Sequence, residues 1–105
     1  MKQPINFVEC ISALNLHLYH CKKNKSFEYG DDFWFIINHL DNKDLIKWTN
    51  RLWQIKGLVV GKSFTKLTDI LHMYNVHKNL YPKQKRWLAM TLLTYWDNIS
   101  LFYEY

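Results

Sequence analysis

Several residue types that mark particular protein classes are scarce in this chain. Its 105 residues include only three glycines and two prolines, which excludes collagen-like chains and flexible linkers. The longest nearly apolar run spans residues 87–96, about half of the roughly 20 residues that a membrane-spanning helix needs. Residues 1–11 also lack the apolar core of a signal peptide. We therefore expect a cytoplasmic protein with no membrane partner.

Cysteine is scarce too, with only Cys10 and Cys21 in the chain. On a single helix their separation corresponds to about 16 Å, whereas the Cα atoms of a disulfide lie within about 7 Å of each other. We expect two free thiols and a reducing compartment. His17, His20 and Cys21 could share one side of a helix, but a structural zinc site needs four ligands and no second ligand pair follows. The sequence therefore predicts neither a metal nor a cofactor.

No motif for catalysis is evident. Residues 57–63 (GLVVGKS) resemble a phosphate-binding P-loop, but three residues separate the two glycines, where that motif has four. The segment also follows a helical pattern instead of the strand that normally precedes such a loop. The six aspartates and three glutamates show no paired arrangement, and no motif supports a nucleophile with a histidine base. We therefore predict that the protein is not an enzyme.

Apolar and aromatic residues, in contrast, are abundant. The chain is 49% hydrophobic and 22% charged, and its aromatic content of 17% comes from five Trp, seven Tyr and six Phe. This composition excludes an intrinsically disordered chain, and a chain of this length can bury enough surface to fold alone. We expect a single helical domain over residues 1–105 with a core built from large rings.

Helical periodicity runs through most of the chain. Pro4 and Pro82 suit the first turn of a helix, and Ser63 can cap another. Residues 57–61 form a break that is either a loop or a short extended segment. The fold class is therefore all-α, a compact bundle of about five helices. The predicted helices cover residues 4–22, 33–40, 43–56, 64–74 and 82–102.

The last predicted helix, residues 82–102, is apolar nearly all round. Such a helix lies either in the centre of a bundle or against a second molecule. Central placement is the simpler interpretation, and a homodimer formed through the helix 82–102 is the alternative.

Charge is unevenly distributed along the chain, although the net value is only +5. Residues 1–42 hold four lysines and five acids, and residues 87–105 hold two acids and no Lys or Arg. Residues 43–86 hold ten basic residues and two acids. The middle segment is therefore the strongest electrostatic feature of the sequence.

One row of hydrogen-bond donors dominates this basic segment. Lys43, Lys47 and Arg51 follow one another at intervals of four residues, so they line one face of the predicted helix 43–56. Asn50 and Gln54 lie within the same row. Lys and Arg neutralise phosphates, while Asn, Gln and Arg can reach base edges. This pattern favours binding to a DNA or RNA backbone.

Further basic residues extend the candidate site. The start of the predicted helix 82–102 combines three cations with the positive end of a helix, which suits an anion. Tyr81 and Trp87 could offer stacking surfaces to unpaired bases. The complete predicted site comprises Lys43, Lys47, Asn50, Arg51, Gln54, Lys62, Lys66, Lys83, Lys85 and Arg86.

Two function classes remain open at this point. The alternative to both is that the basic face only contacts solvent and binds no partner. The first is a small nucleic-acid-binding protein whose binding weakens with salt. The second is an inhibitor, immunity or accessory protein of the kind that phages and mobile elements encode, which would bind a larger protein or ribonucleoprotein machine. In that case the partner could be an acidic protein surface, with Trp, Tyr and Arg as interface anchors.

Overall fold

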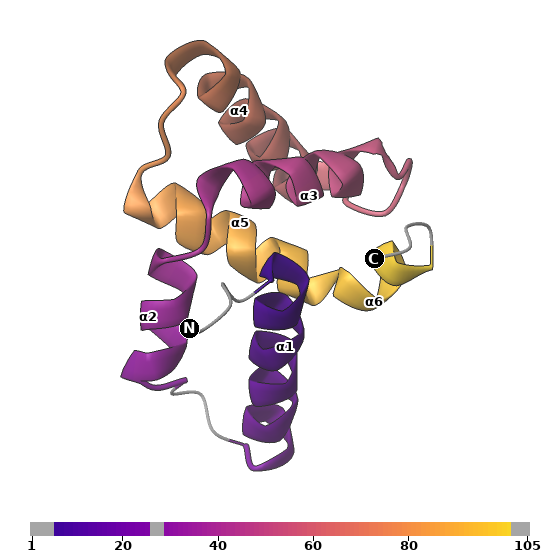
Figure 1. The fold of residues 1–105 in the computed structure, drawn as a ribbon. Helices are drawn as coiled ribbons and strands as arrows, with labels where there is room; N and C mark the ends of the chain where they lie inside the picture. Colours follow the sequence, from indigo (N-terminus) through magenta and orange to yellow (C-terminus); the bar gives the residue numbers. More distant parts are fainter. Residues whose placement is uncertain (1–5, 26–28, 102–105) are drawn as a thin grey trace.

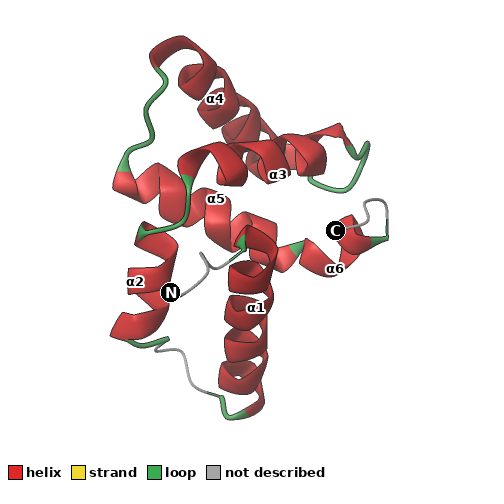
Figure 2. Ribbon diagram, viewed as in Figure 1, coloured by secondary structure: helices red, strands yellow, loops and turns green. Residues whose placement is uncertain are grey.

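The computed structural model describes residues 6–25 and 29–101 and contains six α-helices within these ranges. No strand is found in the described residues (Figure 2). The prediction of an all-α bundle is therefore confirmed. The helices in chain order are α1 (Phe7–Lys23), α2 (Asp31–Asn38), α3 (Asn42–Gln54), α4 (Gly61–His77), α5 (Pro82–Thr94) and α6 (Trp96–Ser100).

Helix α5 lies at the centre of the arrangement. It packs against α1, α2 and α3 and continues into α6. In Figure 1, α1 and α2 lie on one side of α5, while α3 crosses it on the other side and packs against α4. The apolar circumference of α5 is explained by these neighbours, since α5 contacts helices on several of its sides.

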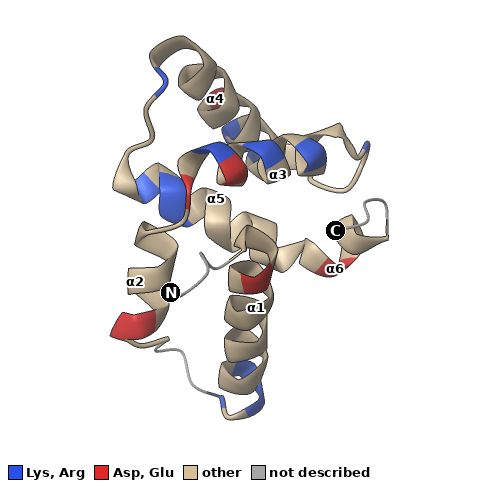
Figure 3. Cartoon of the chain, viewed as in Figure 1, with Lys and Arg blue, Asp and Glu red and all other residues tan. Residues whose placement is uncertain are grey.

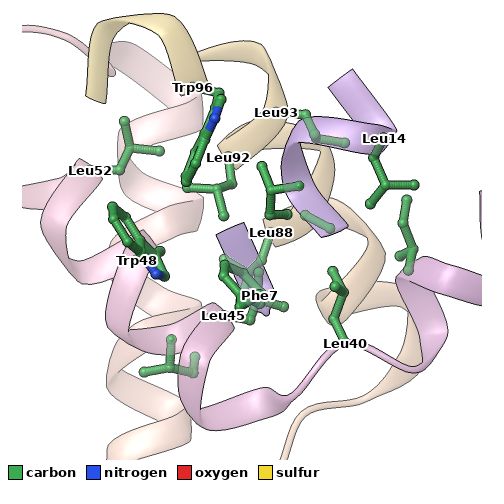
Figure 4. Close-up of a cluster of buried hydrophobic side chains, with 14 of the residues drawn as sticks. Phe7, Leu14, Leu40, Leu45, Trp48, Leu52, Leu88, Leu92, Leu93 and Trp96 are labelled. Carbon is green, nitrogen blue, oxygen red and sulfur yellow. The ribbon is translucent and has the colours of Figure 1, made fainter. Parts of the chain in front are cut away.

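The core joins α1, α3 and α5. Leu88 and Leu92 of α5 are fully buried, as are Leu45 and Leu52 of α3. These side chains surround the same interior in Figure 4, together with apolar residues of α1. The ring centroids of Trp48 and Trp96 lie 5.1 Å apart at the edge of this core. Burial of so many large apolar side chains is the main stabilising contribution to such a fold.

The predicted helix 82–102 is interrupted. Helix α5 ends at Thr94, and α6 begins at Trp96 after a turn at Tyr95 with φ −106° and ψ 12°. The Thr94 hydroxyl donates a hydrogen bond to the carbonyl of Met90 at 2.8 Å, a local bond that favours bending of a helix. The bend accompanies burial of Trp96 and Ile99. Residue 102, the predicted end, lies outside the described residues.

The starts of α1 and α3 follow local capping chemistry. Helix α1 begins at Phe7 because the Asn6 side chain accepts a hydrogen bond from the Val8 N–H at 2.9 Å. The predicted start at residue 4 lies outside the described residues. Helix α3 is capped by Asp41, whose Oδ2 accepts from the Asp44 N–H at 3.0 Å.

Within residues 57–61 the structure has no strand: residues 57 and 58 belong to a turn, Val60 alone has an extended backbone (φ −132°, ψ 166°), and Gly61 begins α4. Gly57 and Gly61 have φ values of +78° and +65°, a left-handed conformation that a β-strand does not contain. Helix α4 begins directly at Gly61, with Val60 as the capping residue and no side-chain cap. The predicted cap at Ser63 was wrong by three residues, because the glycine at position 61 admits the helix earlier and Val60 takes the capping position.

We expect Gly57→Ala to lower the free energy of unfolding by about 1 kcal/mol, since an L-residue is strained in the left-handed region. A Cβ at this position meets no atom within 4 Å, so the cost arises from the backbone alone. Gly57→Asn is the matched control and should cost less, because Asn tolerates this conformation. Chemical denaturation measures both. Equal stability of the wild type and both variants would contradict the left-handed conformation of Gly57.

The described helices include none long and apolar enough to span a bilayer. Cys10 and Cys21 are both free, as their spacing on one helix predicted. Both are half-buried on α1. Burial, followed by the charge of Glu9, raises the pKa of the Cys10 thiol. Cys10 is therefore protonated and weakly nucleophilic at neutral pH.

Candidate nucleic-acid interface

Helix α3 separates its apolar and polar residues onto opposite sides. Its buried side chains are Leu45, Ile46, Trp48, Thr49 and Leu52. The side turned away from the core therefore carries the residues of the predicted row. We call these the α3 row: Lys43, Lys47, Asn50, Arg51 and Gln54. Figure 3 shows blue segments at intervals along α3, with one acidic residue in its first turn.

The members of the α3 row differ in how firmly they are held. Lys43, Lys47 and Gln54 are exposed, whereas Asn50 and Arg51 are half-buried. The Arg51 guanidinium carbon lies 4.4 Å from the centroid of the Trp48 ring, a cation–π contact that orients the charge. Within the described part of the chain, Lys43 and Lys47 have no carboxylate at salt-bridge distance. Their charges are therefore accessible to an anion.

Lys85 and Arg86 do not join this row, because they bind the end of α2. The Lys85 Nζ donates to the backbone carbonyl of Asn38 at 3.0 Å, and the Arg86 Nε donates to the Asn38 side-chain oxygen at 3.3 Å. The Arg86 guanidinium also lies 5.3 Å from the Trp34 ring centroid. Asn38 is the last residue of α2, so both cations stabilise the negative end of that helix.

Lys66 is held in a different place again. Its Nζ lies 4.9 Å from the centroid of the half-buried Trp87 ring, and this contact joins α4 to α5. Trp87 was predicted to stack on an unpaired base, but a face of its ring is already in contact with Lys66. Tyr81, the other proposed stacking residue, is exposed at the start of α5. Lys62 and Lys83 are exposed as well.

Burial lowers the pKa of Lys85 from its ordinary value of 10.5, and the charge of Asp41 opposes that shift. The folded state therefore binds this proton less tightly than the unfolded state does. The free energy of unfolding is expected to rise as the pH passes from the folded-state pKa towards 10.5. An NMR titration of the Lys85 side chain checks the direction. Asp41→Asn should lower the pKa further, and a value at or above 10.5 in the wild type would contradict the burial argument.

Sequence analysis missed an exposed aromatic pair at the junction of α3 and α4. The rings of Trp53 and Phe64 are nearly parallel, with 11° between their planes and 6.1 Å between their centroids. Trp53 is 40% exposed and Phe64 is 37% exposed. A hollow of about 550 Å³ lies beside them, lined by Trp53, Gln54, Lys56, Gly57, Val59, Val60, Gly61 and Phe64. The sequence signal that could have predicted this pair was Trp53, a large ring at the edge of the apolar side of α3 and close to Gly57 and Gly61.

A second hollow of opposite character lies between α1, α2 and the start of α3. Its volume is about 440 Å³, and its lining combines apolar side chains such as Phe35 and Ile36 with three carboxylates, from Glu9, Asp41 and Asp44. Carboxylates repel phosphates, so this hollow does not suit a nucleic acid. The two hollows therefore differ in the charge of their rims.

His17 on α1 has structural partners. The Nε2 of His17 lies 2.7 Å from the carbonyl of Tyr29, and its ring stacks on Phe33 at 5.4 Å. Among residues 6–25 and 29–101, no three His, Cys, Asp or Glu side chains are arranged to hold a metal ion. His17 thus tethers the start of α2 to α1.

Comparison with known proteins yields no match to a family model, to a curated protein or to a solved structure.

Proposed function

We propose that this chain is a small nucleic-acid-binding protein that holds a DNA or RNA backbone on the α3 row. The observation that carries the proposal is the exposure of Lys43 and Lys47 beside Arg51 on the outer side of α3. From residue 43 to residue 51 the row extends for about 12 Å, which matches roughly three nucleotides along one strand. Phosphate contacts by these cations supply most of the affinity.

The polar members of the row have a different role in this proposal. Asn50 and Gln54 carry amides that donate and accept hydrogen bonds, so they can contact sugars or base edges once the cations hold the backbone. The protein acts as a binding module without catalysis or a cofactor. Free thiols at Cys10 and Cys21 suit the reducing cytoplasm as its location.

A second candidate function is favoured by the acidic hollow between α1 and α2. Phe35 is 63% exposed there, and the carboxylates of Glu9, Asp41 and Asp44 share its lining. An exposed ring flanked by charge is typical of a protein interface. Under this candidate the protein is an inhibitor, immunity or accessory factor of the phage or mobile-element type that binds a larger machine.

Titration of labelled oligonucleotides separates the two candidates. Single-stranded and duplex DNA and RNA are titrated by fluorescence anisotropy at about 50 mM and about 200 mM salt. With about three phosphate contacts, the affinity should fall roughly 20-fold for a single strand and roughly 40-fold for a duplex between these conditions. Absence of binding at low salt would overturn the first candidate and favour the second.

A further inference from the structure

The hollow beside Trp53, which we call the Trp53 hollow, lies between the end of α3 and the start of α4. Most of its lining is apolar, from Trp53, Val59, Val60 and Phe64. Val60 is 65% exposed, so the apolar surface is open to a ligand. Its volume of about 550 Å³ is in the size range of small-ligand pockets.

The indole of Trp53 is held in one orientation. Its Nε1–H donates a hydrogen bond to the Thr68 hydroxyl at 2.9 Å, and that hydroxyl donates in turn to the carbonyl of Phe64 at 2.9 Å. The nearly parallel Phe64 ring supports the indole from the neighbouring helix. A ring that is fixed before binding loses little side-chain entropy when a planar group stacks on it.

The surroundings of the Trp53 hollow are positively charged. Lys56 lines it, and no acidic residue is among its described lining residues. Lys62 follows Gly61 in the first turn of α4 and is exposed, and that turn contains no acid. An apolar pocket with a cationic rim suits a ligand that combines a flat apolar group with negative charge, as a nucleotide does.

The hollow is continuous with the α3 row. Gln54 belongs to the row and also lines the hollow. Asn50 lies three residues before Trp53, so the two side chains are neighbours on the helix surface. Arg51 lies two positions before Trp53 and therefore points to the other flank of α3, with Lys47, Asn50 and Gln54 between them. A strand whose phosphates contact Lys47 would therefore reach Trp53 past Asn50 and Gln54.

We infer that the Trp53 hollow binds an unpaired base of a single-stranded nucleic acid, which makes the protein selective for single strands over duplexes. This inference rests on the proposed function. In a duplex the faces of the bases are covered by their neighbours, whereas a single strand leaves them free to stack on aromatic side chains. Cations along the backbone path and a ring at its end are the two components of single-strand recognition.

A variant series tests the inference. The probes are an oligothymidylate of about 15 nucleotides and a hairpin duplex of similar length, both at low salt. Trp53→Leu should weaken binding of the oligothymidylate about tenfold, because one stacking contact is lost, and should leave binding of the duplex within twofold. Trp53→Phe retains a ring and should restore part of the affinity. Phe35→Leu is the matched control, because it removes an exposed ring beside carboxylates, and it should change neither affinity.

A second measurement reads binding from the wild-type protein and uses a variant only to assign a signal. The wild-type protein is labelled with 5-fluorotryptophan, and the Trp53 signal is assigned from its loss in Trp53→Phe. Addition of the oligothymidylate should shift this ¹⁹F signal more than that of buried Trp96. An unshifted Trp53 signal, or equal weakening of both probes by Trp53→Leu, overturns the inference and leaves the α3 row intact. Failure of the wild type to bind either probe overturns the proposed function as well.

Discussion

Reversing two charges with Lys43→Glu and Lys47→Glu is expected to lower the affinity for an oligonucleotide about 100-fold at about 50 mM salt. The double variant removes two phosphate contacts and places two repelling carboxylates on the same face. Both lysines are exposed, so the fold should be unaffected. The slope of log affinity against log salt concentration should also decrease in magnitude by about two, one for each phosphate contact that is lost. Fluorescence anisotropy at several salt concentrations measures both effects.

The matched control is Lys22→Glu with Lys23→Glu in the last turn of α1. It changes the net charge by the same amount, and both lysines are exposed. If binding depends on the position of the charges, the control should keep most of the affinity. An equal loss in both variants would mean that net charge alone attracts the ligand, and the α3 row would not be the site.

Arg51 is excluded from the double variant for a structural reason. Its guanidinium lies against Trp48, whose ring packs on Trp96 in the core. A charge reversal there would combine lost binding with altered packing. Arg51→Lys is the more informative change, since it retains the charge and loses the planar group that stacks on the ring.

Leu88→Ala is expected to lower the free energy of unfolding by about 3 kcal/mol, through lost burial and the cavity that remains. Leu88 is fully buried in α5, the helix that contacts α1, α2 and α3. A cavity at this place loosens several helix contacts at once. Urea or guanidinium denaturation followed by circular dichroism measures the change.

Leu16→Ala is the control for this prediction. Leu16 is 58% exposed on α1, so its truncation removes little buried surface, and Ala has a slightly higher helix propensity than Leu. Its stability should therefore stay within about 0.5 kcal/mol of the wild type. If Leu88→Ala were as stable as Leu16→Ala, the central position of α5 would be wrong.

The sequence by itself determined the helical class and the location of the α3 row. Apolar residues such as Leu45 and Leu52 recur at helical spacing, and Lys43 and Lys47 recur between them on the other side. This information is local, because neighbours three or four residues apart decide which side of a helix a residue occupies. The exposure of Lys43, Lys47 and Gln54 followed from the burial of the opposite side of the helix.

Only the tertiary structure decided which basic residues have partners. Lys85 contacts Asn38, which lies 47 positions away in the chain, and Lys66 lies over Trp87 from a different helix. No local pattern encodes such contacts, since they depend on how α2, α4 and α5 pack. The same holds for the Trp53 hollow, which arises where the α3–α4 turn brings Phe64 against Trp53. Helical periodicity is a property of neighbouring residues, whereas these contacts exist only after distant segments have packed together.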